Sequence, residues 1–268
     1  MPRAAVLGKP VAHSRSPVIH RAGYAAAGLT GWSYTAIECA EAELAGFVAG
    51  LGPEWAGLSL TMPLKEGALV VADQVAPLAA TLGAANTLVH QPDGGWRAEN
   101  TDAPGIAEAL GPVAPGATMA VLGAGGTARA ALGAAARLRT DRVAVVARRP
   151  AAIAALEPVA TALGLHLSHH PWSAAVEVLG SADVVVSTVP KGVADPLAGQ
   201  VAWPSGAVLL DALYDPWPTP LAAAAAASGV RVASGLDLLL AQAVGQFELF
   251  TGMPAPVDAM RQALTASG

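Results

Sequence analysis

The stretch TMAVLGAGGTARA, residues 118–130, decides the fold of this chain. Its first five residues, 118–122, form an apolar run of the length typical of a buried strand. A glycine-rich turn at 123–126 follows, and an alanine-rich segment typical of a helix runs over 127–137. Glycines let the backbone approach a pyrophosphate, and the helix N-terminus supplies amide donors and a positive dipole. A dinucleotide site is therefore favoured here over an ordinary tight turn.

The region after this turn repeats the alternation of strand and helix. We expect strands at 142–147, 165–168, 183–188 and 208–213, a short strand at 230–233, and helical stretches between them. Strands separated by helices predict a parallel sheet that is covered on both faces.

The end of the second strand in this series indicates which nucleotide is bound. It reads Ala147-Arg148-Arg149, whereas an NAD enzyme usually has Asp or Glu there for the ribose 2′-hydroxyl. Arginine suits a 2′-phosphate. We therefore favour NADP, and a solvated basic pair at the strand end is the alternative.

The region before residue 118 has the pattern of a mixed α/β domain of about 100 residues. Ser16 is expected as the N-cap of a helix over 16–27, with Pro17 at its first helical position. The tetrapeptide 92–95, Pro-Asp-Gly-Gly, predicts a hairpin. The other segments expected here, and at the end of the chain, are strands at 4–8, 32–38, 55–61, 86–90 and 96–99 and helices at 41–51, 236–250 and 257–266.

The composition excludes several classes of protein. Of the 268 residues 53% are hydrophobic and only 13% are charged, which excludes a disordered chain. Glycines and prolines interrupt every long uncharged stretch, so no membrane span is expected, and the first residues lack the pattern of a signal peptide. A net charge of −5 without basic clusters argues against a nucleic-acid partner. The single cysteine, Cys39, permits no intrachain disulfide and fits a reducing cytoplasm.

Lysine is rare in this chain, since only Lys9, Lys65 and Lys191 stand against 12 arginines. Lysine gives up its proton far more readily than arginine. Lys65 is expected on the first turn of a helix opened by Pro63, where the helix dipole disfavours a cation. This placement indicates a role such as proton transfer, and an ordinary surface lysine is the alternative, which the rarity of lysine in this chain weakens. Asp102 is a candidate to pair with Lys65 and share its proton, with ordinary turn chemistry as the alternative.

Two further groups of polar residues have a structural and a functional interpretation. The hydroxyls of Ser14 and Ser16 surround a helix start, where they can either bind a carboxylate or simply cap the helix. His166, His169 and His170 have no carboxylate or cysteine nearby in the sequence. We therefore expect a solvated loop there and no metal site.

The combination of motifs resembles the NADP-dependent shikimate dehydrogenase family, and the resemblance runs from Gly8 to Gly252. Each motif is moderately specific, and together they are very specific. They are GKPVAHSRSP at 8–17, TMPLK at 61–65, GAANT at 83–87, NTD at 100–102, GAGGTARA at 123–130, STVPKG at 187–192, DALYDPWPTPL at 211–221 and GLDLLLAQA at 235–243.

The resemblance implies an enzyme of aromatic amino-acid biosynthesis that reversibly reduces 3-dehydroshikimate to shikimate with NADPH. Its fold class is α/β, with a mixed α/β substrate domain and a Rossmann-like parallel-sheet domain. Residues 1–101 would form the substrate domain, completed by helices in 236–268, and 102–235 the NADP domain. The ligands would be small molecules bound in the cleft between the domains.

The resemblance also implies a role for individual positions. Lys65 and Asp102 would be the catalytic pair, and Ser14 and Ser16 would hold the substrate carboxylate. Arg148 would meet the 2′-phosphate. The remaining positions would be Thr61, Asn86 and Gln242 at the ring hydroxyls, Tyr214 at the substrate's edge, Gly123, Gly125, Gly126, Thr127 and Ala128 at the cofactor phosphates, Thr188 at the adenosine and Gly235 at the nicotinamide.

The chain departs from the family pattern at four places. Arg21 replaces a usual Asn, Ser59 begins a segment that commonly reads N-V-T, Leu238 replaces a common Met, and the N-R-T segment reads Ala147-Arg148-Arg149. Two alternatives therefore stay open, an NAD-using quinate/shikimate dehydrogenase and a catalytically silent nucleotide-binding module. The arginines argue against the first, and the retained Lys65 and Asp102 argue against the second. The sequence leaves the oligomeric state open, a homodimer included.

Overall fold

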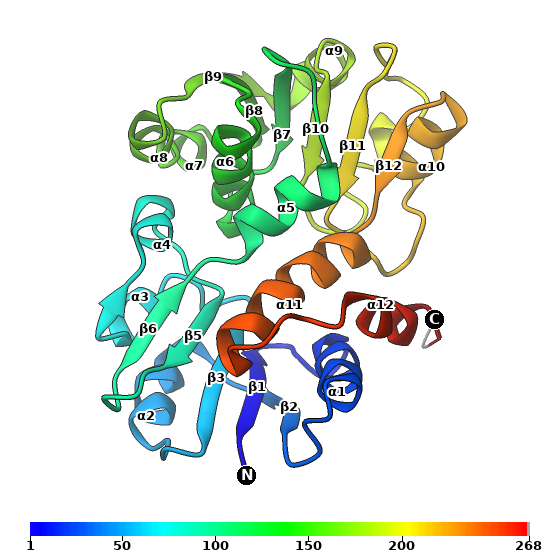
Figure 1. The fold of residues 1–268 in the computed structure, drawn as a ribbon. Coiled ribbons are helices and arrows are strands. Elements are labelled where there is room, and N and C mark those ends of the chain that lie inside the picture. Colours follow the sequence, from blue (N-terminus) through cyan, green and yellow to red (C-terminus); the bar gives the residue numbers. More distant parts are fainter. Residues whose placement is uncertain (267–268) are drawn as a thin grey trace. The chain divides into compact units, whose positions relative to one another are not determined.

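The computed structural model describes residues 1–266, and the chain divides into two compact units (Figure 1). The split unit comprises Met1–Thr101 and the residues from Leu239 onward. The inserted unit comprises Asp102–Leu238. The second boundary thus falls three residues after the one predicted from the sequence.

The split unit is built on a six-stranded mixed sheet with the order β2-β1-β3-β5-β6-β4. The first three of these strands are parallel, and β5 runs antiparallel to both β3 and β6, as the predicted hairpin requires. Its elements are β1 (Arg3–Gly8), α1 (Ser16–Ala26), β2 (Ser33–Glu38), the 3₁₀ turn η1 (Glu41–Glu43), α2 (Leu44–Ala49), β3 (Trp55–Leu60), α3 (Ala68–Val71), β4 (Gln74–Val75), α4 (Pro77–Leu82), β5 (Thr87–His90), β6 (Trp96–Glu99) and α12 (Val257–Ala266), with the end of α11 (Gly235–Thr251).

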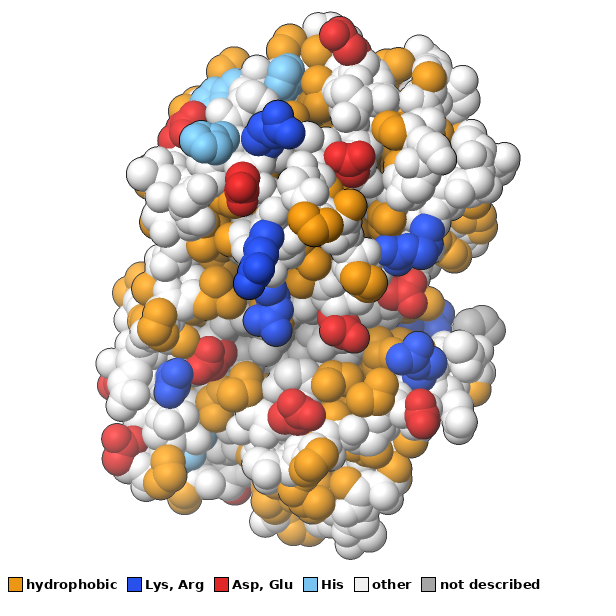
Figure 2. Space-filling model, turned by 45° about the horizontal axis from the view of Figure 1, so that its top comes forward, with side chains coloured by type: hydrophobic (Ala, Val, Ile, Leu, Met, Phe, Trp, Pro, Cys, Tyr) orange, Lys and Arg blue, Asp and Glu red, His pale blue; other side chains and the backbone are white. Residues whose placement is uncertain are grey.

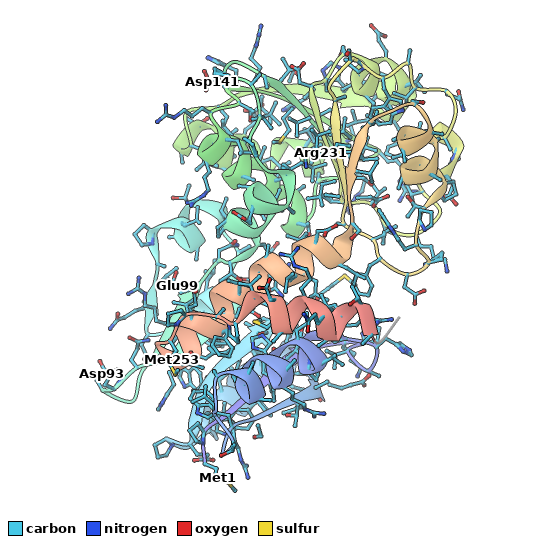
Figure 3. All side chains as sticks on the ribbon, turned by 45° about the vertical axis from the view of Figure 1, so that its right-hand side comes forward. Met1, Asp93, Glu99, Asp141, Arg231 and Met253 are labelled. Carbon is cyan, nitrogen blue, oxygen red and sulfur yellow. The ribbon has the colours of Figure 1, made fainter. Side chains whose placement is uncertain are left out.

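The last two helices complete the core of the split unit. A Cβ atom on Gly23 of α1 would lie 3.0 Å from the Phe247 ring of α11 and 3.2 Å from Met260 of α12. Glycine at this position therefore allows the three helices to pack closely. Figure 3 shows where α11 ends, near Met253, and Asp93 at the tip of the β5–β6 hairpin.

The inserted unit is built on a six-stranded sheet with the order β12-β11-β10-β7-β8-β9, in which every neighbouring pair is parallel. Counted from its own first strand, this is the order 6-5-4-1-2-3 of a Rossmann fold. Its elements are α5 (Asp102–Leu110), β7 (Thr118–Leu122), α6 (Gly126–Leu138), β8 (Arg142–Ala147), α7 (Pro150–Ala154), α8 (Glu157–Ala162), β9 (His166–Pro171), the 3₁₀ turn η2 (Trp172–Ala174), α9 (Ala175–Gly180), β10 (Val184–Ser187), the 3₁₀ turn η3 (Asp195–Leu197), β11 (Val208–Asp211), α10 (Pro220–Ala227) and β12 (Arg231–Ala233), with the start of α11.

Both faces of this parallel sheet are buried. Ala120 and Leu122 of β7 belong to one core cluster with Leu179 of α9 and Leu221 of α10. Val121 points to the opposite face because successive side chains of a strand alternate, and it too is fully buried. The sequence prediction of a parallel α/β sheet with helices on both faces is confirmed.

Two local predictions in the split unit are wrong. Helix α1 begins at Ser16 with Arg15 as its N-cap, so Ser16 is not the cap, and instead the Ser14 hydroxyl accepts the Ser16 N–H at 3.3 Å. Lys65 lies in a turn over residues 62–67, before α3 begins at Ala68. Lys65 therefore does not lie on the first turn of a helix, and no helix dipole disfavours its charge. The argument from that dipole for a catalytic role of Lys65 has no basis.

Other differences concern short elements. The segment 41–51 forms η1 and then α2, which ends at Ala49, and the sequence patterns gave no sign of β4, α4 or α5. The three clustered histidines lie on the edge strand β9 and not in a loop, and His169 pairs with Glu157 at 2.6 Å. None of the helices described over residues 1–266 is long and apolar enough to span a membrane.

Candidate functional site

The glycine-rich turn follows β7 and is tied to both neighbouring strands. Gly123 has φ +106°, and a Cβ atom there would lie 2.4 Å from Thr188 Oγ1. Its N–H donates to the Val146 carbonyl at 2.9 Å. Only glycine fits this backbone and this space, so the turn is held close to the carboxyl ends of β8 and β10.

The start of α6 is open where the turn ends. Gly125 precedes the helix in an extended conformation, and no atom lies within 4 Å of the position of a Cβ atom there. The first amides of a helix have no partner within it, and here they belong to Gly126, Thr127 and Ala128. This bare backbone and the positive end of the helix dipole fit a phosphate group.

Arg148 follows β8, and its side chain is exposed. It lines a hollow of about 430 Å³ together with His169 and Trp172, whereas Arg149 does not line it. On the face shown in Figure 2, Lys and Arg side chains are scattered among hydrophobic and uncharged ones, and His side chains gather in one place. An exposed guanidinium at the carboxyl edge of β8 fits a 2′-phosphate.

Thr188 and Gly235 each bring two backbone segments of the inserted unit close together. The Thr188 hydroxyl donates to the Leu122 carbonyl at 2.7 Å. Gly235 begins α11, and a Cβ atom there would lie 2.3 Å from the Ala212 carbonyl oxygen. Both residues therefore hold neighbouring segments close together at the carboxyl edge of the sheet.

Tyr214 is half-buried in the loop that follows β11, and the sequence reasoning missed the acid that orders this loop. Asp211 is 1% exposed, accepts the Thr219 hydroxyl at 2.7 Å and accepts the Leu213 N–H at 3.2 Å. Burial raises the pKa of Asp211, and the hydrogen bond from Thr219 opposes that rise. Asp211 is the first residue of the motif DALYDPWPTPL, and this position was the signal in the sequence that could have identified it.

In the split unit, the parallel strands β1 and β3 bring two predicted segments to one edge of the sheet. The loop with Ser14 and Ser16 follows β1, and Thr61 follows β3. The Thr61 N–H donates to the Leu7 carbonyl at 2.9 Å, and a Cβ atom on Gly8 would lie 2.3 Å from Thr61 Cγ2. Glycine at position 8 thus allows the two segments to approach.

Asn86, Thr101 and Gln242 form a buried polar cluster in the same unit. Asn86 Oδ1 accepts the Thr101 N–H at 2.8 Å, and Asn86 Nδ2 lies 3.3 Å from Gln242 Oε1. Asn86 lies just before β5, Thr101 lies two residues after the end of β6, and Gln242 lies on α11. Two of them, Asn86 and Gln242, are residues for which the family resemblance implies contact with the substrate's ring hydroxyls.

Lys65 is half-buried in its turn, which the Ala85 N–H holds by donating to the Lys65 carbonyl at 2.8 Å. This bond places the turn beside the residue that precedes Asn86. Asp102 is 7% exposed and is the first residue of α5 and of the inserted unit. Because the two residues belong to different units, their pairing stays a prediction.

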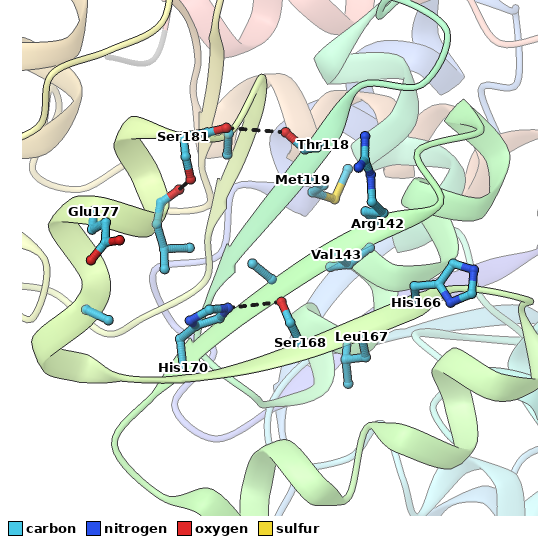
Figure 4. Close-up of a pocket in the computed structure, with 14 residues that line it drawn as sticks. Thr118, Met119, Arg142, Val143, His166, Leu167, Ser168, His170, Glu177 and Ser181 are labelled. Atoms are coloured by element: carbon cyan, nitrogen blue, oxygen red, sulfur yellow. Dashed lines mark hydrogen bonds between the residues drawn. The ribbon is translucent and has the colours of Figure 1, made fainter.

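Another hollow in the inserted unit lies away from all these residues. It has a volume of about 440 Å³ and lies at the amino-terminal ends of β7, β8 and β9 (Figure 4). Arg142, His166 and Glu177 line it, and none of the predicted site residues does. Ligands of parallel α/β sheets bind at the carboxyl ends of the strands, so this hollow is not the nucleotide site. Within residues 1–266 no group of His, Cys, Asp and Glu could hold a metal ion.

Comparison with known proteins gives a consistent result over nearly the whole chain. Residues 6–88 match the family model "Shikimate dehydrogenase substrate binding domain", and 235–265 match "Shikimate 5'-dehydrogenase C-terminal domain". A shikimate dehydrogenase (NADP(+)) of Caulobacter vibrioides is 39% identical over 94% of this chain and 90% of its own length. One of Methylobacterium radiotolerans is 40% identical over 95% and 93%. The chain belongs to the shikimate dehydrogenase family.

Solved structures of the family share this fold. The shikimate dehydrogenase of Mycobacterium tuberculosis aligns with a TM-score of 0.92 and 49% identity over 100% of both chains. The enzyme of Thermus thermophilus, in complex with NADP(H) and shikimate, aligns with a TM-score of 0.86 and 35% identity over 100% of both chains. As a shikimate dehydrogenase family member, the chain is an oxidoreductase with a Rossmann-like unit, as the sequence predicted.

Proposed function

We propose that this chain catalyses the reversible, NADPH-dependent reduction of 3-dehydroshikimate to shikimate. The proposal rests on the residues that the split unit's sheet brings together at one edge. There the Lys65 turn is hydrogen-bonded to Ala85, next to the buried cluster of Asn86, Thr101 and Gln242. The backbone of a potential proton donor is thus held beside amide groups suited to a polyhydroxylated ring.

In this proposal Lys65 protonates the ketone oxygen during reduction. The oxygen gains negative charge as the ketone is reduced, and an ammonium group in a half-buried turn stabilises that charge and then delivers a proton. Asp102 orders Lys65 and favours its charged form. Ser14 and Ser16 hold the substrate carboxylate, and Tyr214 lies at the substrate's edge. In the reverse direction Lys65 accepts the hydroxyl proton.

The inserted unit carries residues that fit NADP. Gly123, Gly125 and the first amides of α6 offer bare backbone to the phosphates, and Arg148 offers a guanidinium to the 2′-phosphate. When bound, NADPH supplies the hydride for the ring carbon. Thr188 and Gly235 keep the strand ends close, so that the cofactor meets a preformed edge.

Quinate oxidation with NAD is the competing function. The quinate dehydrogenase of Corynebacterium glutamicum, in complex with NAD, aligns with a TM-score of 0.88 at 27% identity. The two arginines after β8, in place of an acid, favour NADP for this chain.

The deciding experiment is an absorbance assay of nicotinamide reduction on the purified chain. Shikimate and quinate are each crossed with NADP⁺ and NAD⁺, and kcat/KM is measured for the four pairs. We expect shikimate with NADP⁺ to give the highest value. Turnover of quinate with NAD⁺ at an equal or higher kcat/KM would overturn the assignment, and no turnover with any pair would favour a silent binding module.

We place the reaction in the cytoplasm, without nucleic acid as a partner. The single cysteine, Cys39, is a buried free thiol, which fits a reducing compartment. The net charge of −5 opposes binding to a polyanion.

A further inference from the structure

Three buried polar side chains form a continuous chain of hydrogen bonds through the split unit. Tyr34, Ser59 and Gln246 lie on β2, β3 and α11 and are 0%, 4% and 1% exposed. The Tyr34 hydroxyl lies 2.6 Å from Ser59 Oγ, and Ser59 Oγ lies 2.6 Å from Gln246 Oε1. Gln246 Nε2 then reaches the Asn86 carbonyl at 3.2 Å and Thr87 Oγ1 at 3.0 Å. We call these three residues the buried chain.

The direction of every bond in the buried chain is fixed. A backbone carbonyl only accepts, so the amide nitrogen of Gln246 must face Asn86 and its oxygen must face Ser59. Ser59 therefore donates to Gln246 and accepts from Tyr34. Reversing the Gln246 amide would set its oxygen against the Asn86 carbonyl and leave two buried groups unsatisfied.

The same reasoning fixes the side chain of Asn86. A backbone N–H only donates, so the bond from Thr101 sets Asn86 Oδ1 toward residue 101. The Thr87 hydroxyl, which accepts from Gln246, donates to the same oxygen at 3.0 Å. Asn86 Nδ2 is therefore the atom turned to Thr101 Oγ1 at 2.9 Å and to Gln242 Oε1 at 3.3 Å. The amide thus presents its donor nitrogen on the side of Gln242, the other residue proposed for the ring hydroxyls.

The other end of the buried chain reaches Ser16 at the start of α1, next to Ser14 in the preceding loop, and we call Ser14 and Ser16 with this loop the serine loop. Burial raises the pKa of Tyr34, and its hydrogen bonds with Ser59 and Ser16 oppose that rise. The ring of His20, on α1, stacks on Tyr34 with centroids 4.1 Å apart and planes 4° from parallel. Tyr34 is thus held between α1, which begins at Ser16, and β3.

We propose that Gln246 is a positioning residue for the substrate, which acts through Asn86 and not by contact with the ring. It fixes the donor orientation of Asn86 through Thr87, and it joins that amide to the carboxylate-binding serine loop through Ser59 and Tyr34. The inference rests on the proposed function, because it assumes that Asn86 and Ser16 bind shikimate. It also gives Ser59, a departure from the family's N-V-T pattern, a defined partner on α11.

The test compares Gln246→Met and Tyr34→Phe with Tyr24→Phe as the matched control. Tyr24 is 2% exposed, and its hydroxyl has no hydrogen-bond partner among the described residues, so Tyr24→Phe removes a buried hydroxyl outside the buried chain. Kinetic constants for shikimate and for NADP⁺ are measured, with shikimate binding by calorimetry and thermal melting of each variant.

For Gln246→Met we expect the KM and Kd for shikimate to rise about 10-fold, which is the factor expected when about one hydrogen bond to the substrate is weakened or lost. The KM for NADP⁺ should change less than 2-fold, roughly the scatter of such measurements. Tyr34→Phe should shift the shikimate constants in the same direction by a smaller factor, and Tyr24→Phe should leave them unchanged. A purely structural role would lower the melting temperature without this selective effect.

Several outcomes would overturn the inference. These are shikimate constants unchanged in Gln246→Met, equal rises for shikimate and NADP⁺, or a Tyr34→Phe variant indistinguishable from Tyr24→Phe. If Gln246→Met does not fold, the tyrosine pair alone decides. Failure of the proposed function is separate, because it would appear as absence of shikimate turnover in the unmodified chain.

Discussion

The backbone N–H of Thr101 donates a hydrogen bond to Asn86 Oδ1 across 2.8 Å. The two residues flank the β5–β6 hairpin, whose antiparallel ladder pairs Thr87 with Glu99. The contact therefore closes the hairpin at its base. Since Thr101 is also the last residue before the inserted unit, the same bond fixes the point at which the chain leaves the split unit.

Lys65→Met should lower kcat about 100-fold or more, because the variant loses a general acid–base group. The Kd for shikimate should change much less than kcat. Lys191→Met is the control, since Lys191 is an exposed lysine outside the proposed site. Stopped-flow measurement of a single turnover checks the chemical step, and a near-normal rate in Lys65→Met would rule out the assigned role.

Arg148→Ala should raise the KM for NADP⁺ about 10- to 100-fold, the loss expected for a charge-assisted hydrogen bond. The KM for NAD⁺, which has no 2′-phosphate, should stay nearly unchanged. Arg142→Ala serves as the control because it removes the same charge from the opposite end of β8. Equal losses for both nucleotides would place the 2′-phosphate elsewhere.

Gly123→Ala and Gly125→Ala should separate folding from cofactor binding. At Gly123, φ is +106° and Thr188 Oγ1 leaves no room, so alanine should cost about 1–3 kcal/mol of stability. At Gly125, φ is −100° and the space is open, so alanine should leave stability within about 0.5 kcal/mol. It should still raise the KM for NADP⁺, because its methyl group occupies the space that a phosphate needs. Urea unfolding and kinetics of both variants check this, and equal stability losses would contradict it.

The stability of the split unit should depend on pH through His20. Burial lowers the pKa of His20 from 6.5 to about 3, and Gln246 offsets a small part of this shift, although neither ring nitrogen has a hydrogen-bond partner of good geometry in the described residues. Between pH 6.5 and about pH 3, His20 is therefore protonated in the unfolded chain and neutral in the folded protein. The stabilisation is complete above pH 6.5 and is lost as the pH falls toward 3.

From pH 7.5 to pH 5 this linkage should cost the protein about 2 kcal/mol. His20→Phe should lack this loss, so its stability relative to the unmodified protein should improve by about 2 kcal/mol over the same interval. Urea unfolding at both pH values measures the difference. His13→Phe, at an exposed position, is the control. A constant difference between His20→Phe and the unmodified protein would contradict the assigned burial of a neutral ring.

The inserted unit could be predicted from the sequence because its signals are local. Three signals lie within 31 residues of one another. The run 118–122 indicates a strand, the glycines after it indicate the turn, and the arginine after the next strand indicates the charge that meets the nucleotide. The parallel order of the strands then follows from the alternation with helices. The prediction of β7 and β8 matched their bounds in the structure.

The split unit was less predictable because its polar contacts join distant segments. Pro63 is compatible with a turn as well as with a helix start, and for this reason the prediction of a helix at Lys65 was wrong. Ser59 and Gln246 are separated by 187 residues, and no short pattern marks their contact. The assignments of Ser14, Ser16, Asn86 and Gln242 came from the family resemblance, whereas the hydrogen bonds that orient Asn86 required the structure.

The split unit receives its last helices only after the whole inserted unit has been synthesised. On the ribosome, residues 102–238 emerge as one uninterrupted segment and can begin folding while the first 101 residues still lack α11 and α12. Gln242 and Gln246 are synthesised after Asn86 and Ser59, the residues of the split unit to which they are hydrogen-bonded. Translation order therefore completes the inserted unit first, and a nascent chain gains Gln242 and Gln246 only near the end of its production.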